Sequence, residues 1–321
     1  MRKSLTGRFF LWFILAISFA SQASGQDCGC SQPPGCCADE CESGDCCTDC
    51  LSCCNRWLGL LPSDHCFERF VSPLSNPFYF EDPRSLTEVR GIFLDNNLPA
   101  AIGGGDLQVE ALQLRGRLTE RWSVVMARLA NINVNQPGGP AGLLSVPIGV
   151  KYNFVRDVEC QRLLTVGLTY FIPGSAQPLP PPGGGDFHIY LSGGTQLGDC
   201  GHWLSATGLR LPADNFLGTQ LWYWSNQWDY EVRENWYAVA GVNWFHYLSN
   251  SGAGFTGDIG GLDLLNLPAA TVAGNDFVTG VVGGKWKPTE HWELGLGYEF
   301  PLTGAADILR DRLYVDVVLR Y

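Results

Sequence analysis

Apolar and polar residues alternate along most of the chain after Pro83. The clearest example spans residues 144–154, where the even positions are apolar and the odd positions are polar, small or proline. Residues 164–172 and 187–192 repeat this pattern. Neighbouring side chains leave opposite faces of a strand, so a period of two predicts strands with one apolar and one polar face.

The alternation predicts about twelve strands joined by connections of two kinds. The expected strand ranges are 86–98, 106–118, 121–134, 142–156, 162–175, 184–198, 202–213, 217–231, 235–249, 273–287, 291–303 and 310–321. Short polar turns are expected at 119–120, 156–161, 198–201, 232–234 and 288–290, and long Gly-, Pro- and Asn-rich loops elsewhere. Strands of this length, with turns and loops alternating, favour a transmembrane barrel over a soluble sandwich. We therefore expect an all-β, antiparallel, up-and-down transmembrane β-barrel over residues 84–321.

Aromatic residues mark both a predicted membrane interface and the end of the chain. Four short turns are followed at once by a tryptophan, which predicts an interface aromatic belt of Trp122, Trp203, Trp236 and Trp292. The last strand alternates apolar residues up to a terminal aromatic: Leu313, Val315, Val317, Leu319 and Tyr321. This ending resembles the assembly signal of the bacterial outer-membrane β-barrel (porin-like) superfamily, without pointing to a subfamily. The resemblance implies a barrel surrounded by outer-membrane lipid and inserted by the outer-membrane assembly machinery.

Residues 1–25 have the pattern of a cleaved secretory signal peptide. Three basic residues precede an apolar stretch from Phe9 to Ala20, and small residues follow it. The apolar stretch is shorter than the roughly 20 residues of a spanning helix. We therefore expect export from the cytoplasm and a bacterial outer-membrane location.

Residues 26–55 form a cysteine-rich segment that is expected to lie in the periplasm. It holds ten of the thirteen cysteines: Cys28, Cys30, Cys36, Cys37, Cys41, Cys46, Cys47, Cys50, Cys53 and Cys54. Disulfides are the main expectation in an oxidising compartment, while thiolate ligation of zinc and disorder are the alternatives. Cys160 and Cys200 lie in successive short turns and are a further disulfide candidate, with separate thiols or pairing to Cys66 as alternatives. Residues 56–83, rich in aromatic residues, leucine and proline, are expected to be a linker or a partial plug.

Charged residues within strands are expected to face the lumen, because arginine or lysine facing lipid at the midplane costs about 2 to 4 kcal/mol. The candidates are Glu88, Arg90, Glu110, Arg115, Arg117, Lys151, Arg210, Lys285, Glu293, Glu299, Arg312, Asp316 and Arg320. They either pair and seal the interior or line a water-filled passage, in which Gly149, Gly167, Gly295 and Gly297 leave room. The apolar stretch 262–267 of the longest loop is expected to fold inwards or to bind at the surface.

Composition and spacing narrow the function classes. A net charge of −11 with no basic patch in the exported part argues against a nucleic-acid partner. His188 and Ser192, the one suggestive catalytic pair, lie about 13 Å apart along a strand, so no enzyme is predicted. No cofactor or metal is predicted either. The leading hypothesis is a narrow porin-like channel for passive diffusion of small solutes. The alternative is a closed structural or adhesive barrel, anchored through its cysteine-rich segment to a periplasmic or cell-wall partner.

Overall fold

A computed structural model describes residues 58–100, 104–134, 141–174, 184–254, 260–266, 268–304 and 309–321. The predicted signal peptide (1–25) and the cysteine-rich segment (26–55) lie outside these residues. Within the described ranges, no helix is both long enough and apolar enough to cross a membrane.

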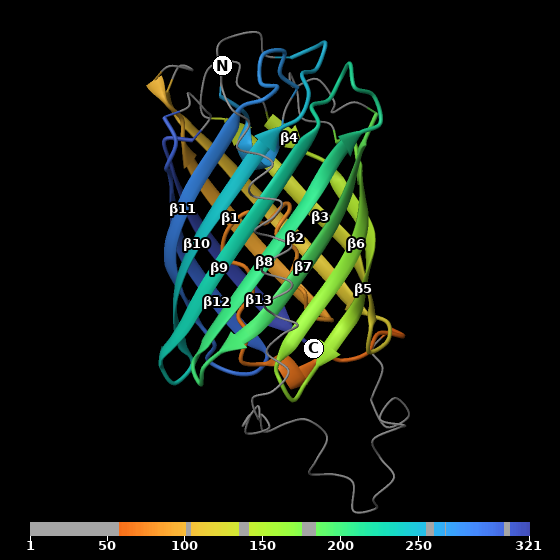
Figure 1. Cartoon of the computed structure of the whole chain (residues 1–321), viewed down its shortest axis with the longest axis vertical. Helices are drawn as coiled ribbons and strands as arrows, with labels where there is room; N and C mark the ends of the chain where they lie inside the picture. Colours follow the sequence, from red (N-terminus) through yellow and green to blue (C-terminus); the bar gives the residue numbers. More distant parts are fainter. Residues whose placement is uncertain are drawn as a thin grey trace, which may run out of the picture. The chain divides into compact units, whose positions relative to one another are not determined.

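The described chain forms one antiparallel sheet that closes on itself (Figure 1). Its strands are β1 (Glu88–Asn97), β2 (Asp106–Arg117), β3 (Trp122–Val134), β4 (Ala141–Leu143), β5 (Val146–Asp157), β6 (Arg162–Ile172), β7 (Asp186–Leu197), β8 (Gly201–Pro212), β9 (Leu221–Arg233), β10 (Trp236–Tyr247), β11 (Asp276–Trp286), β12 (Trp292–Pro301) and β13 (Asp311–Arg320). Both β4 and β5 pair with β3, so the two occupy one position in the ring. The predicted barrel of about twelve strands is confirmed.

Apart from β4, which pairs only with β3, each strand pairs with the two strands beside it in the ring, and β13 pairs with β1 to close it. Five tight turns lie at one end of the barrel, together with the C-terminal Tyr321. Three of these turns use left-handed backbone, at Gln161 with φ 48°, at Gly198 with φ 66° and at Asn235 with φ 64°. Glycine and asparagine adopt this conformation most readily, which explains why the chain reverses at Gly198 and Asn235.

The outer wall of the barrel is apolar along the middle of the strands. Leu296 is 57% exposed, Ile148 52% and Ile189 46%, and all three point away from the lumen. The inward neighbours on the same strands are small or polar, as the alternation predicts. A wall of this kind is stable against hydrocarbon rather than water.

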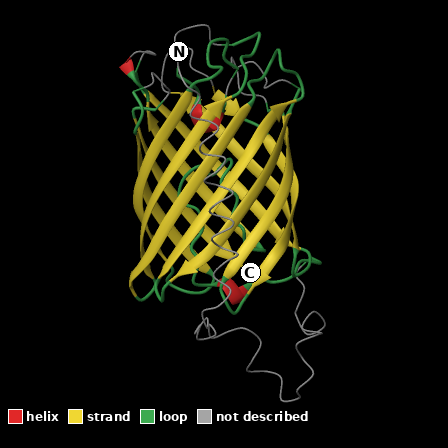
Figure 2. Ribbon diagram, in the orientation of Figure 1, coloured by secondary structure: helices red, strands yellow, loops and turns green. Residues whose placement is uncertain are grey.

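Residues 61–87 run inside the ring before β1 begins (Figures 1 and 2). The segment enters at the short-turn end, where Leu61 N donates to Arg117 O and Ser63 N to Tyr321 O. It leaves by the same end, where Thr87 continues into β1. Its one regular element is the 3-10 helix η1 (His65–Phe67). We call residues 61–87 the inner segment.

Cys160 and Cys200 are not joined to each other by a disulfide. Cys160 lies in the hairpin of β5 and β6, and Cys200 in the hairpin of β7 and β8. The centres of these hairpins are two strand spacings apart, about 10 Å, whereas a disulfide needs Cα atoms about 5.5 Å apart. The alternative in which Cys160 and Cys200 form a disulfide with each other was therefore wrong.

Candidate functional site

Alternation along the strands turns most of the charged candidates into the lumen. The buried, inward-facing members are Glu88, Arg90, Arg115, Lys151, Arg210, Lys285, Glu293, Glu299, Arg312, Asp316 and Arg320. Arg117 is half-buried near the short-turn end, where its guanidinium donates to Pro62 O at 3.1 Å. The lumen is therefore lined by both signs of charge.

Glu110 is the exception, because it is exposed on the outer face. The inward positions of β2 are odd-numbered, including Val109 and Ala111, and parity places Glu110 among the outward ones. It pairs with Asn131, which is also exposed. The prediction that Glu110 faces the lumen was wrong, because it considered charge without strand parity.

A continuous network of ion pairs runs along the inner face of the wall, from β11 through β12 and β13 to β1. Glu293 accepts from Arg320 at 2.8 Å and from Lys285 at 3.1 Å. Lys285 also contacts Asp316 at 2.7 Å, and Asp316 pairs with Arg90. All five side chains are almost fully buried, so each charge depends on its partners.

The inner segment adds charged residues of its own to this network. Arg115 contacts Glu81 of the inner segment at 2.5 Å and also pairs with Glu88 of the wall. Arg84 forms an ion pair with Asp82 at 2.7 Å and donates to Phe70 O at 2.7 Å. Strand alternation does not reveal these residues. The signal was the charged run around Pro83 within an otherwise apolar stretch.

The main chain of the inner segment is held by polar side chains of the wall. Ser72 N donates to Glu293 at 2.9 Å, and Leu74 N donates to Gln227 at 2.7 Å. Arg90 donates to Pro73 O at 2.6 Å. The wall thus supplies the hydrogen bonds that an irregular buried chain needs.

Neighbouring side chains fill the space in front of the lumen-facing glycines. A Cβ on Gly297 would lie 2.8 Å from Leu74, and one on Gly283, its partner across the strands, 2.6 Å from the same side chain. These two glycines form a socket for Leu74. The spaces at the other glycines expected to leave room are filled as well, at Gly149 by Thr169, at Gly167 by Tyr190 and at Gly295 by Lys285 and Asp316.

At the end opposite the short turns, the longest loop folds into the lumen. Its 3-10 helix η3 (Asp263–Leu265) places Asp263 against Arg312 at 2.5 Å. Arg312 also contacts Glu299 at 2.9 Å. Leu262 and Leu264 are buried there, so the inward alternative for this loop is the one observed.

His188 and Ser192 contact different partners in the lumen. His188 shares a 2.9 Å hydrogen bond with Tyr223, and Ser192 donates to Glu81 O of the inner segment. Arg210, which pairs with His188 in register, forms an ion pair with Asp186 and donates to Tyr79 of the inner segment at 2.5 Å. The structure does not bring His188 and Ser192 together.

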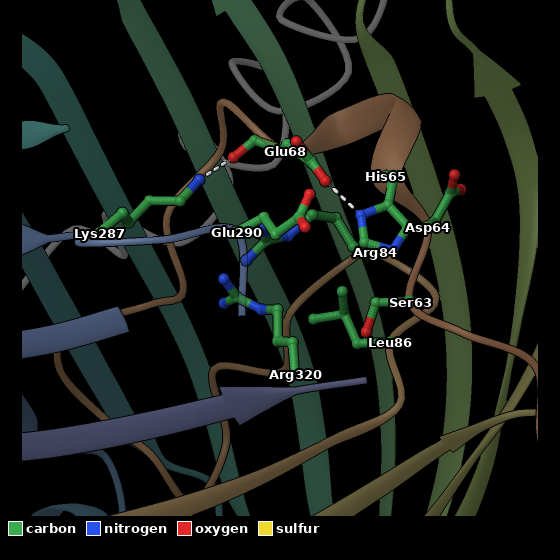
Figure 3. Close-up of a pocket in the computed structure, with 9 residues that line it drawn as sticks. All are labelled: Ser63, Asp64, His65, Glu68, Arg84, Leu86, Lys287, Glu290 and Arg320. Atoms are coloured by element: carbon green, nitrogen blue, oxygen red, sulfur yellow. Dashed lines mark hydrogen bonds and ion pairs between the residues drawn. The ribbon is translucent and has the colours of Figure 1, made fainter. Parts of the chain in front are cut away.

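A small pocket lies where η1 meets the turn between β11 and β12 (Figure 3). Its lining includes Ser63, Asp64, His65, Glu68, Arg84, Leu86, Lys287, Glu290 and Arg320. The hydrogen bond to Glu68 raises the pKa of His65. Burial acts to raise the pKa of Glu68, but the hydrogen bond and charge of His65, together with the charges of Lys287 and Arg320, outweigh burial and lower it. Burial, with Arg320 nearby, lowers the pKa of Lys287 to about 7.

The predicted belt tryptophans all face outwards near the short turns. Trp122, Trp236 and Trp292 are each more than two-fifths exposed, and Trp236 stacks on Trp286 at 5.2 Å. Trp203 is half-buried and donates to Asn226 at 3.2 Å. A role for these residues at the membrane interface stays a prediction.

The proposed assembly residues Leu313, Val315, Val317 and Leu319 face outwards on β13, and Tyr321 follows that strand. Tyr321 N donates to Thr87 O at 3.0 Å, which joins the two ends of the barrel. We predict that Tyr321→Ala lowers the amount of folded barrel in outer-membrane fractions, whereas Tyr321→Phe preserves it. Heat-modifiable gel migration measures this fraction. Equal amounts in both variants would contradict a role for the terminal aromatic ring.

No protein-family model matches the chain, and no curated protein matches it. Similar solved structures include the KdgM porin in complex with disordered oligogalacturonate, at 9% identity and TM-score 0.44, covering 73% of this chain and 99% of that one. The translocator domain of the autotransporter NalP from Neisseria meningitidis has 11% identity and TM-score 0.39, covering 75% and 91%. The outer membrane channel DcaP of Acinetobacter baumannii has 12% identity and TM-score 0.33, covering 74% and 71%.

The architecture rests on this chain's own geometry. A closed ring without sheet edges, an apolar outer wall and a charged lumen occur together in one class of protein. The described chain is a closed antiparallel β-barrel with the architecture of a transmembrane barrel, with twelve strand positions around an internal chain segment.

Proposed function

We propose that the protein is a porin-like outer-membrane channel for small solutes that is closed at rest by its inner segment. The supporting observation is how that segment is held. Most of the hydrogen bonds that join its main chain to the barrel wall involve polar side chains of the wall, including Glu293, Gln227 and Arg90. Water can replace such bonds when the segment moves, and the charged wall then lines an aqueous path.

The proposal extends to the parts of the chain that precede the barrel. Residues 1–25 act as a cleaved signal peptide, and the outer-membrane assembly machinery inserts the barrel. The cysteine-rich segment lies in the periplasm and carries disulfides. Movement of solute is passive and involves no enzymatic step.

Conductance in planar bilayers tests the channel. The inner segment has one short 3-10 helix, whereas the wall is a closed ladder of strands. Moderate urea is therefore expected to release the inner segment before the barrel unfolds. We expect little current from the native protein in buffer and a reversible rise in current in urea.

Heat-modifiable migration measured at the same urea concentration is the control for an intact barrel. A barrel that stays folded yet passes no current at any voltage or urea concentration would overturn the proposal. That result would support the closed structural or adhesive barrel.

A further inference from the structure

Three potential metal ligands face one another in the pocket at the short-turn end (Figure 3). His65 and Glu68 belong to the inner segment, and Glu290 to the turn between β11 and β12. One donor atom from each lies within 4.8 Å of the other two. The side chains of Glu68 and Glu290 are 29% and 59% exposed, so the group is open to solvent.

The local fold holds two of these ligands side by side. Residues three apart lie above one another on a 3-10 helix, which places His65 next to Glu68. Asp64 accepts from Cys66 N and caps the helix, while Arg156 binds the Asp64 carboxylate at 2.8 and 2.9 Å. This anchoring fixes the helix against the barrel wall.

The cationic residues that line the pocket have other partners. Arg84 is bound to Asp82 and to Phe70 O. Arg320 is shared between Glu88 at 3.1 Å and Glu293 at 2.8 Å. Lys287 donates to the main-chain oxygen of Glu68 rather than to its carboxylate. The donor oxygens of Glu68 and Glu290 therefore have no ion pair with these three cations.

From this geometry we propose that His65, Glu68 and Glu290 bind one zinc ion, with water as a fourth ligand. Imidazole and carboxylate oxygen are established zinc ligands, and three protein ligands with one open position are typical of an accessible site. At bond lengths of about 2.0 to 2.1 Å, tetrahedral ligand atoms lie about 3.3 Å apart. Small side-chain rotations bring the three donors to that separation, and the His65 proton that contacts Glu68 is released.

The ion joins the inner segment to the barrel wall, because two ligands lie on one and the third on the other. Zinc thus stabilises the docked position of the inner segment at the mouth where that segment enters. The site does not depend on whether the lumen conducts, so it stands apart from the proposed channel function.

The test is equilibrium dialysis of the full-length folded protein against buffered free zinc, comparing native protein, Glu290→Gln and Glu234→Gln. Glu234 is an exposed carboxylate in another short turn and serves as the matched control. The clustered cysteines are the same in all three proteins, so any zinc that they bind cancels in the comparison. We expect native protein and Glu234→Gln to bind one more zinc per chain than Glu290→Gln, or at least about tenfold more tightly.

A second measurement follows heat-modifiable migration with and without zinc. Zinc is expected to raise the temperature at which native protein loses its compact form, and to have a smaller effect on Glu290→Gln. Equal zinc binding by all three proteins would overturn the proposal. So would a loss of binding in Glu234→Gln as large as that in Glu290→Gln.

Discussion

In planar bilayers, Gly297→Leu is expected to open about ten to a hundred times more often than the native protein. A Cβ at this position would lie 2.8 to 2.9 Å from Leu74 of the inner segment, closer than packed carbon atoms approach. Overpacking of this kind typically costs about 1 to 3 kcal/mol. Because the wall is a closed ladder and the inner segment is not, the inner segment is expected to yield.

The control is the same substitution on the opposite face. Gly91 lies on β1 at an outward position, and its nearest contact for an added Cβ is Val317 O at 3.9 Å. Gly91→Leu therefore adds an apolar side chain to the lipid-facing wall and should leave the current unchanged. If both variants conduct equally, release of Leu74 from its socket is not what opens the lumen.

The second large effect concerns stability. Glu293→Gln is expected to destabilise the barrel by about 3 kcal/mol or more, because it removes a buried carboxylate that Arg320 and Lys285 share. Those two cations stay buried with fewer partners. The measurement is the denaturant midpoint of the folded barrel, followed by tryptophan fluorescence.

Glu234→Gln is again the matched control, since substitutions of exposed residues usually change stability by no more than about 0.5 kcal/mol. A midpoint for Glu293→Gln equal to that of the control would show that water, rather than Glu293, balances Arg320 and Lys285. The expected order is a clear shift for Glu293→Gln and none for Glu234→Gln.

The barrel wall could be predicted from the sequence because it follows a strictly local rule. The predicted strand 162–175 corresponds to β6 (Arg162–Ile172), and the predicted strand 106–118 to β2 (Asp106–Arg117). Whether a residue faces inwards depends only on its odd or even position along the strand. The prediction for Glu110 was wrong because it did not use this alternation. The predicted strand 142–156 is interrupted between β4 and β5 at Leu144 and Ser145, a detail without a clear local signal.

The filling of the lumen could not be predicted in the same way. Contacts such as Ser72 to Glu293 and Leu74 to Gln227 join residues more than 150 positions apart and follow no period. The glycines of the wall gave an ambiguous signal, because a missing side chain can leave a passage or receive a neighbour. Gly167 receives Tyr190 and Gly297 receives Leu74, which only the assembled barrel reveals.

The path of the inner segment also has a topological consequence. The inner segment enters and leaves the ring at the same end, near Ser63 and Thr87. It therefore folds back on itself inside the barrel and does not pass through from one end to the other. Withdrawing it requires no chain end to pass through the ring and no strand to leave its neighbour. The inner segment and the enclosing ladder are unlinked, so movement of the segment out of the lumen and back leaves the pairing of β1 with β13 closed.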